Sequence, residues 1–298
     1  MPTPDHKAFI ENTARILDNH GYKVTIIARN CFDLVATKDE QTLMVKVLTN
    51  ANAFSNKYVH ELQHICHYMK AAPLIVAQNA GAPLEEGIVY SRLGVFTVSP
   101  DTLKSSLKNH APVVLSTNAG LTTSIHGEKL RELREAKGLS LQQLAMKLGV
   151  SRRMVAKYEN EATEVTLHRA SRLFDLFGED IFHKIDVFDG HHNYHTDYVK
   201  DVHSPLTSKY FQLGFHAFRT NHSPFDIIAR NDSHVIFTGV GDRHKSSMLD
   251  LAKAMDVDKL VIFNRKHPHA DDAVPALSKG EFMRFQQYGE LRDFLKEF

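Results

Sequence analysis

The strongest constraint on the fold of this chain is the pattern of helix starts and stops between residues 127 and 161. Apolar and basic side chains recur there at helical spacing until Gly138 interrupts them. Ser140 is placed to cap a second helix, whose apolar face ends before Gly149. Ser151 is placed to cap a third helix. The sequence therefore predicts short helices joined by tight turns.

Two short helices separated by a few residues, the first ending in glycine, are typical of a helix-turn-helix. The phrases "GEKLRELRE", "GLSLQQLA" and "GVSRRMVAKYE" resemble the DNA-binding domain of lambda-repressor and Cro-type regulators, the XRE family. The resemblance implies a five-helix unit whose third helix lies in the major groove of double-stranded DNA. It also implies a buried ion pair between the first helix and the end of the third, here Arg134 and Glu159.

Carried over by position, the resemblance implies DNA contacts around the second and third helices. Arg152, Arg153 and Lys157 are expected to face base edges, with a preference for guanine because its O6 and N7 are paired acceptors. Hydroxyl groups at helix N-termini favour phosphate. The remaining candidates are Ser140, Gln142, Gln143 and Ser151. The chain departs from many family members at Leu141, where they have a glutamine that holds a phosphate. A helical bundle that binds proteins is the alternative to DNA binding.

The two segments that flank this helical stretch resemble each other. Placing Gly21 on Gly214 aligns "FDLVATKDEQTLMVKV" with "FDIIARNDSHVIFTGV" without gaps. In both copies a helix, an apolar strand, a short strand and a terminal helix follow. We infer a duplicated mixed α/β module with an all-α domain inserted between the copies. The expected boundaries are 1–122 and 189–298 for the two modules and 123–188 for the inserted domain.

The order of elements in each module resembles the restriction-endonuclease-like fold, which includes archaeal Holliday-junction resolvases. Asp33 and Lys46 match the acid and the lysine of that fold's active site. Met44 stands in place of the second acid, and a thioether is a poor ligand for Mg²⁺. The second copy keeps Asp226 and lacks both the acid and the lysine. We therefore expect no catalytic residues, no bound metal or cofactor and no enzymatic activity.

Histidines form two groups in the sequence. His60, His64 and His67 fall on one face of a predicted helix, where they could bind zinc only with a fourth ligand. A second group lies in the linker after the inserted domain and comprises His191, His192, His195 and His203. We interpret both groups as solvated histidines. An alternative is that they make dimerisation or DNA affinity respond to pH.

Composition narrows the cellular setting. No run of residues approaches the roughly 18 consecutive apolar residues of a membrane span, and the N-terminus lacks the pattern of a secretory signal. The two cysteines do not suggest a disulfide framework. The net charge of +1 argues against coating of nucleic acid by the whole chain, although a local basic surface is compatible with it. We expect a cytoplasmic protein that does not bind membranes.

The whole chain resembles an archaeal group of helix-turn-helix transcriptional regulators of similar length, with "FDLVA" and "MVKVL" extending the resemblance into the first module. It implies a sequence-specific DNA-binding regulator. Because one helix-turn-helix contacts only a few base pairs, we expect the protein to bind a palindromic operator as a homodimer. The flanking modules are then expected to serve dimerisation or sensing of an unknown effector. Two alternatives remain: a metal-dependent, structure-specific DNA nuclease and a chromatin-organising protein.

Overall fold

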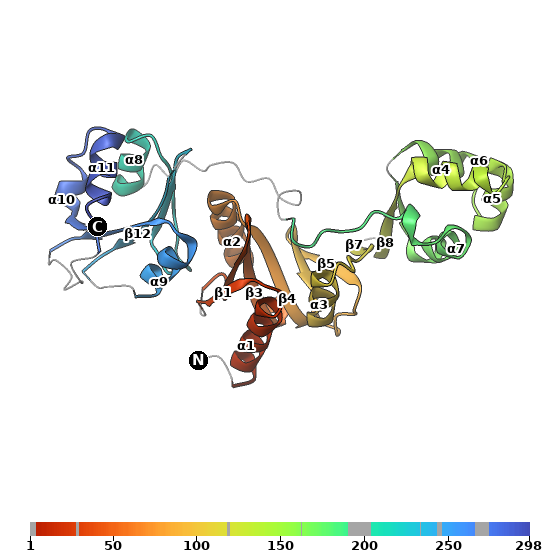
Figure 1. Ribbon diagram of the computed structural model, residues 1–298, viewed down its shortest axis with the longest axis horizontal. Coiled ribbons are helices and arrows are strands. Elements are labelled where there is room, and N and C mark those ends of the chain that lie inside the picture. The colour runs from red at the N-terminus through yellow and green to blue at the C-terminus, as the bar shows by residue number, and fades with distance from the viewer. Residues whose placement is uncertain are drawn as a thin grey trace.

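The protein forms two α/β modules and a helical region that lies at one end of the molecule (Figure 1). The computed structural model describes residues 4–27, 30–117, 120–161, 163–189, 204–232, 234–242, 246–265 and 274–298. The linker group of His191, His192, His195 and His203 lies outside these ranges. Within the described residues, no helix has the length and apolar character needed to cross a bilayer.

The first module is a mixed sheet covered by helices on both faces. Its helices are α1 (Pro4–Asp18), the short 3-10 helix η1 (Ala51–Ala53), α2 (Asn56–Met69) and α3 (Pro100–Leu107). Its strands are β1 (Lys23–Ile26), β2 (Leu34–Lys38), β3 (Gln41–Asn50), β4 (Ala72–Asn79), β5 (Ile88–Arg92) and β6 (Val95–Val98). The strands lie in the order β1-β2-β3-β4-β6-β5.

Alternation along the central strand β3 explains why both faces are covered. Leu43, Val45 and Val47 enter the apolar cluster beneath α1 and α3. Met44, between them, enters the cluster beneath α2. Because successive side chains of a strand point to opposite faces, consecutive apolar residues require helices on both sides.

The second module repeats this plan. Its helices are α8 (Pro205–Gln212), α9 (Ser246–Met255), α10 (Lys279–Phe282) and α11 (Tyr288–Leu295). Its strands are β10 (His216–Arg219), β11 (Ile227–Arg230), β12 (Val235–Val240), β13 (Asp258–Phe263) and β14 (Ala276–Ser278), which lie in that order in the sheet.

Strand register confirms that the two modules are related. Leu34 pairs with Val45 in the first sheet, and Ile227 pairs with Thr238 in the second. These residues correspond when Gly21 is placed on Gly214, the alignment that the sequence predicts. The expected class, two related mixed α/β modules flanking a helical domain, is therefore confirmed.

The two modules share one apolar core, to which α2 and α9 both contribute. Polar contacts reinforce it. The buried carboxylate of Glu61 on α2 accepts the backbone N–H groups of Asn221 (3.1 Å) and His222 (2.7 Å). The side chain of Arg230 on β11 donates to the carbonyl of Tyr68. The copies therefore pack against each other within one chain.

The inserted region combines helices with an extension of the first sheet. Its described helices are α4 (Gly127–Ala136), α5 (Leu141–Leu148), α6 (Arg152–Asn160), α7 (Leu167–Phe177) and the 3-10 helix η2 (Glu179–Ile181). Three further strands, β7 (Val114–Thr117), β8 (Gly120–Ile125) and β9 (Thr163–Thr166), continue the sheet from β5 in that order, giving nine strands in all.

The strands change two details of the sequence-based expectation. Strand β8 runs across the expected boundary between residues 122 and 123. The chain between α6 and α7 includes strand β9, whereas the resemblance implies a helical unit throughout. Strand β9 forms for two reasons. Thr163, Val165 and Thr166 are β-branched residues, which favour strands, and the edge of β8 lies beside them and pairs with them.

Candidate nucleic-acid interface

Side-chain caps fix where α5 and α6 begin. The Ser140 hydroxyl accepts the N–H of Gln143 (3.2 Å), and the Gln143 side chain accepts the N–H of Ser140 (2.8 Å), which forms a capping box. The Ser151 hydroxyl accepts the N–H of Met154 (3.2 Å). Between the two helices, Gly149 has a φ of 66°, a left-handed conformation that favours glycine. The helix boundaries that the sequence predicts are present.

A buried ion pair fixes the end of α6 against α4. Arg134 donates through Nε and Nη2 to the two carboxylate oxygens of Glu159, at 2.5 and 2.9 Å. Its Nη1 also donates to the carbonyl of Leu139 (2.8 Å). Hydrogen bonding to Glu159 is the main cause that raises the pKa of the Arg134 guanidinium. The pair implied by the resemblance is confirmed.

The cationic residues of α6 lie on the face that points away from the core. Val155 and Tyr158 are buried in the core of the helical region, whereas Arg152 and Arg153 are exposed. No ion pair to either arginine occurs in the described part of the chain. Lys157 is also exposed and forms an ion pair with Glu161 (3.6 Å). The start of α6 therefore presents two guanidinium groups to solvent.

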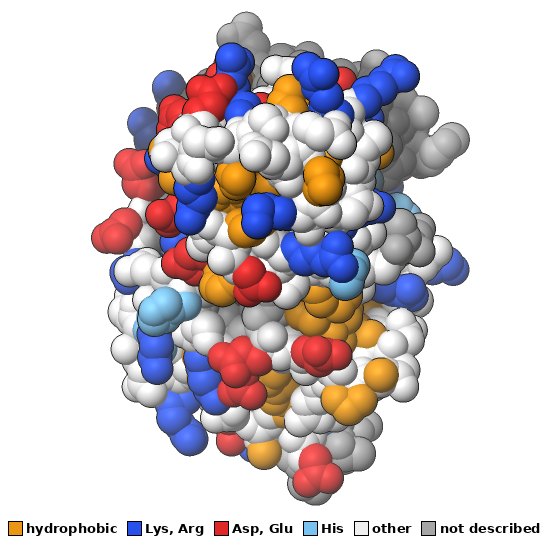
Figure 2. All heavy atoms as spheres, turned by 90° about the vertical axis from the view of Figure 1, so that its right-hand side faces the viewer, with side chains coloured by type: hydrophobic (Ala, Val, Ile, Leu, Met, Phe, Trp, Pro, Cys, Tyr) orange, Lys and Arg blue, Asp and Glu red, His pale blue; other side chains and the backbone are white. Residues whose placement is uncertain are grey.

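The other predicted contact residues lie at the N-termini of α5 and α6. Ser140, Gln142, Gln143 and Ser151 are all exposed. The cap hydrogen bonds use the two hydroxyl oxygens as acceptors and leave their O–H groups free to donate to a phosphate. The Gln143 side-chain oxygen is already engaged in the capping box. Figure 2 shows this end of the molecule, where basic side chains are dispersed among acidic and apolar ones.

Sequence reasoning missed a supporting contact. Arg172 on α7 donates to the carbonyl of Leu148 (3.2 Å), at the turn between α5 and α6. Its guanidinium would also lie 3.1 Å from a Cβ added at Gly149. The contact joins residues far apart in the sequence, so no local pattern indicates it.

The nuclease-like residues of the first module make buried polar contacts with one another and with the backbone. The buried carboxylate of Asp33 accepts the Lys46 ammonium (3.1 Å) and the N–H of Val47 (3.0 Å). Lys46 also donates to the carbonyl of Asn30 (2.8 Å). Met44, at the position of the second acid, is fully buried. The carboxylate thus joins the start of β2 to the neighbouring strand β3.

The second copy has the same strand contact. Asp226 accepts the N–H of Val240 (2.6 Å), the counterpart of the bond between Asp33 and Val47. At the lysine position, a Cβ on Gly239 would approach the sulfur of Met248 to 3.3 Å. The Met248 side chain of α9 therefore packs against this position.

Of the three histidines on α2, His64 lies at the contact between the modules, whereas His60 is exposed. The ring of His64 stacks on Phe218 of the second module, with centroids 4.8 Å apart. Burial, and then the charges of His60 and His67, lower the pKa of His64. No cluster of three or more metal-binding side chains is found among the described residues.

Comparisons with known proteins agree with this architecture. A model described as "PD-(D/E)XK superfamily domain" matches residues 6–113, and one described as "Helix-turn-helix" matches residues 130–182. The chain is 32% identical over 243 residues to a protein of Methanospirillum hungatei, an alignment that covers 79% of each chain. It is 29% identical over 306 residues to a protein of Thermococcus kodakarensis, covering 98% of this chain and 96% of the relative.

Both relatives carry the name "Putative HTH-type transcriptional regulatory protein". The fold and the exposed face of α6 define a helix-turn-helix protein of the DNA-binding class, attached to nuclease-like α/β modules. The chain belongs to the family of archaeal HTH-type transcriptional regulatory proteins. The resemblance found in the sequence is therefore confirmed.

Replacing Arg134 by alanine is expected to lower the free energy of unfolding of the helical region by about 3–5 kcal/mol, because it leaves the Glu159 carboxylate buried without its partner. Arg131→Ala is the control, since Arg131 forms an exposed pair with Glu135. Its cost should not exceed about 0.5 kcal/mol. Denaturant titration followed by circular dichroism measures both. Equal losses would show that the buried pair does not stabilise the region.

Proposed function

We propose that this protein is a cytoplasmic, sequence-specific transcriptional regulator that binds a palindromic operator in double-stranded DNA as a homodimer. The observation that carries the proposal is the exposed pair of arginines at the start of α6, on a helix held from behind by Arg134 and Glu159. A rigid helix with cationic tips at its N-terminus fits the major groove.

Each group has a distinct role in this proposal. Arg152 and Arg153 donate in pairs to guanine O6 and N7, which discriminates among base pairs. Ser140 and Ser151, with the backbone N–H groups at their helix starts, hold phosphates and fix the position of α6 along the duplex. Lys157 adds charge near the backbone.

Dimerisation supplies affinity that a single helix-turn-helix lacks, because two reading helices at fixed separation match a two-fold symmetric site. The face shared by the two α/β modules is already covered within the chain. On α7, by contrast, Leu167 and Phe174 are 42% and 53% exposed. They are seven positions apart and so lie on one side of the helix. We propose this side of α7 as the two-fold contact.

Arg153→Ala is expected to weaken binding to the operator by about 1–3 kcal/mol and to relax base preference at one position. The operator is first identified by mapping bound sites across the genome. Fluorescence anisotropy at fixed salt then compares operator with random DNA, and Arg131→Ala on α4 is the control for loss of one surface arginine. An equal loss on both DNAs would show that Arg153 contacts phosphate.

Phe174→Asp is expected to convert the dimer into a monomer and to weaken binding to the full operator while leaving binding to a single half-site unchanged. The added charge opposes burial of the α7 side in a contact. Met283→Asp, at an exposed apolar residue of the second module, is the control. Analytical ultracentrifugation measures the mass. A variant that remains dimeric would place the contact elsewhere.

We further propose that the protein is not a nuclease, although its first module matches a PD-(D/E)XK domain. The support is the Asp33 carboxylate, engaged by Lys46 and Val47 in a buried position beside apolar Met44. Divalent-metal catalysis of phosphodiester hydrolysis needs carboxylates that are open to the metal.

The expected outcome is no cleavage of duplex, flap or junction DNA with Mg²⁺ or Mn²⁺, and no difference between wild type and Asp33→Asn. Denaturing gels of end-labelled substrates measure it. Cleavage that disappears with Asp33→Asn while the variant remains folded would establish the protein as an enzyme.

A further inference from the structure

The helical region is closed at its base by a short antiparallel ladder that we call the neck, residues 124–126 and 181–183. The His126 N–H donates to the carbonyl of Ile181 (2.7 Å), and the His183 N–H donates to that of Ser124 (3.0 Å). Ile125 and Phe182 form the bridge between these bonds. The neck joins the two segments through which the chain enters and leaves the helical region.

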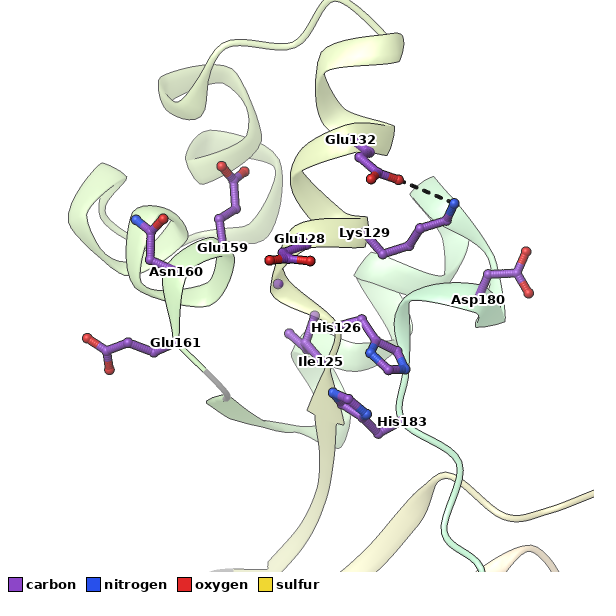
Figure 3. A pocket seen from close by; sticks show the side chains of 11 residues that line it. Ile125, His126, Glu128, Lys129, Glu132, Glu159, Asn160, Glu161, Asp180 and His183 are labelled. Atoms are coloured by element: carbon purple, nitrogen blue, oxygen red, sulfur yellow. Dashed lines mark hydrogen bonds and ion pairs between the residues drawn. The ribbon is translucent and has the colours of Figure 1, made fainter.

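Strand alternation places two histidines together on the outer face of the neck. Ile125 and Phe182 point inward to the core of the helical region. Residues next to them in each strand therefore point outward, and His126 and His183 are diagonal neighbours. Their ring centroids are 3.3 Å apart. Figure 3 shows the two imidazoles facing each other.

The pair lines a cavity of about 550 Å³ with an acidic wall. Among its carboxylates, Glu132 pairs with Lys129, Glu159 with Arg134 and Glu161 with Lys157. Two more line it, from the first turn of α4 and from η2, and have no ion-pair partner in the described part of the chain: Glu128 and Asp180. The cavity therefore favours a cation.

The side-chain chemistry of the pair suits a metal ion. An imidazole nitrogen without a proton carries a lone pair that can bind a metal. Neutral imidazole is the preferred nitrogen ligand of Zn²⁺, Ni²⁺, Co²⁺ and Cu²⁺.

We propose that His126 and His183 bind a divalent transition-metal ion at the neck. Metal–nitrogen bonds are about 2.0–2.1 Å long, and because both side chains are exposed, an ion can approach them from solvent. The described residues hold no third ligand in place, so water completes the coordination while Glu128 and Asp180 attract the ion through space. This site is independent of the DNA contacts, and its test requires no DNA.

The test is isothermal titration of the full chain, without an affinity tag, with Zn²⁺ and with Ni²⁺. The double variant His126→Ala, His183→Ala is compared with a control that removes three histidines elsewhere, His191→Ala, His192→Ala, His195→Ala. We expect wild type and control to bind one ion per chain that the neck variant loses or binds at least about tenfold more weakly.

Co²⁺ provides a second readout, since its visible absorption reports nitrogen ligation. A band that disappears only in the neck variant supports the proposal. Because both imidazoles are exposed and the neck hydrogen bonds are made by backbone atoms, the variant should fold, which circular dichroism checks. Unchanged metal affinity in the neck variant, loss in the control alone, or no binding by wild type would overturn the proposal.

Discussion

The apolar contact between the two α/β copies is the constraint on which the arrangement of the modules depends. Phe225 stacks on Phe237 at 4.3 Å, in the same cluster as the buried face of α2. A carboxylate as buried as that of Glu61 is costly unless its oxygens are satisfied. Its Oε1 accepts two backbone N–H groups of the opposite module, and its Oε2 contacts Nδ1 of His222. Separation would expose apolar surface and leave that charge without partners, so the copies act as one body.

Within that body, the same aspartate performs the same structural task twice. Asp33 and Asp226 each accept a backbone N–H from the neighbouring strand. A residue that a nuclease would use for metal binding is therefore also valuable to the sheet itself, which gives a physical reason for its presence where the second acid is absent. In our proposal that the protein is not a nuclease, fold likeness and catalytic competence separate at Met44, because chemistry depends on the site.

Local patterns predicted the parts of this molecule that local physics determines. The caps at Ser140 and Ser151 and the turn at Gly149 depend on neighbouring residues, and the sequence indicated them correctly. Aligning the two copies in the sequence correctly predicted which residues occupy equivalent positions in the two sheets. Three features depend on residues that are distant in sequence, and the local pattern of a sequence does not indicate them. They are the packing of the two copies, the pairing of β9 with β8 and the contact between His126 and His183. The DNA contacts themselves remain predictions.

The ribbon of β7 and β8 has a mechanical consequence. The ribbon continues the sheet from β5 into the helical region (Figure 1). The helix-turn-helix is therefore connected to the first module through hydrogen-bonded strands, which are stiffer than a flexible linker. Such a connection resists twisting of the helix-turn-helix relative to the first module. In a dimer, the protein would then fix the relative orientation of the two copies of α6. If the DNA between the two half-sites of an operator were lengthened by half a helical repeat, one half-site would face away from the protein.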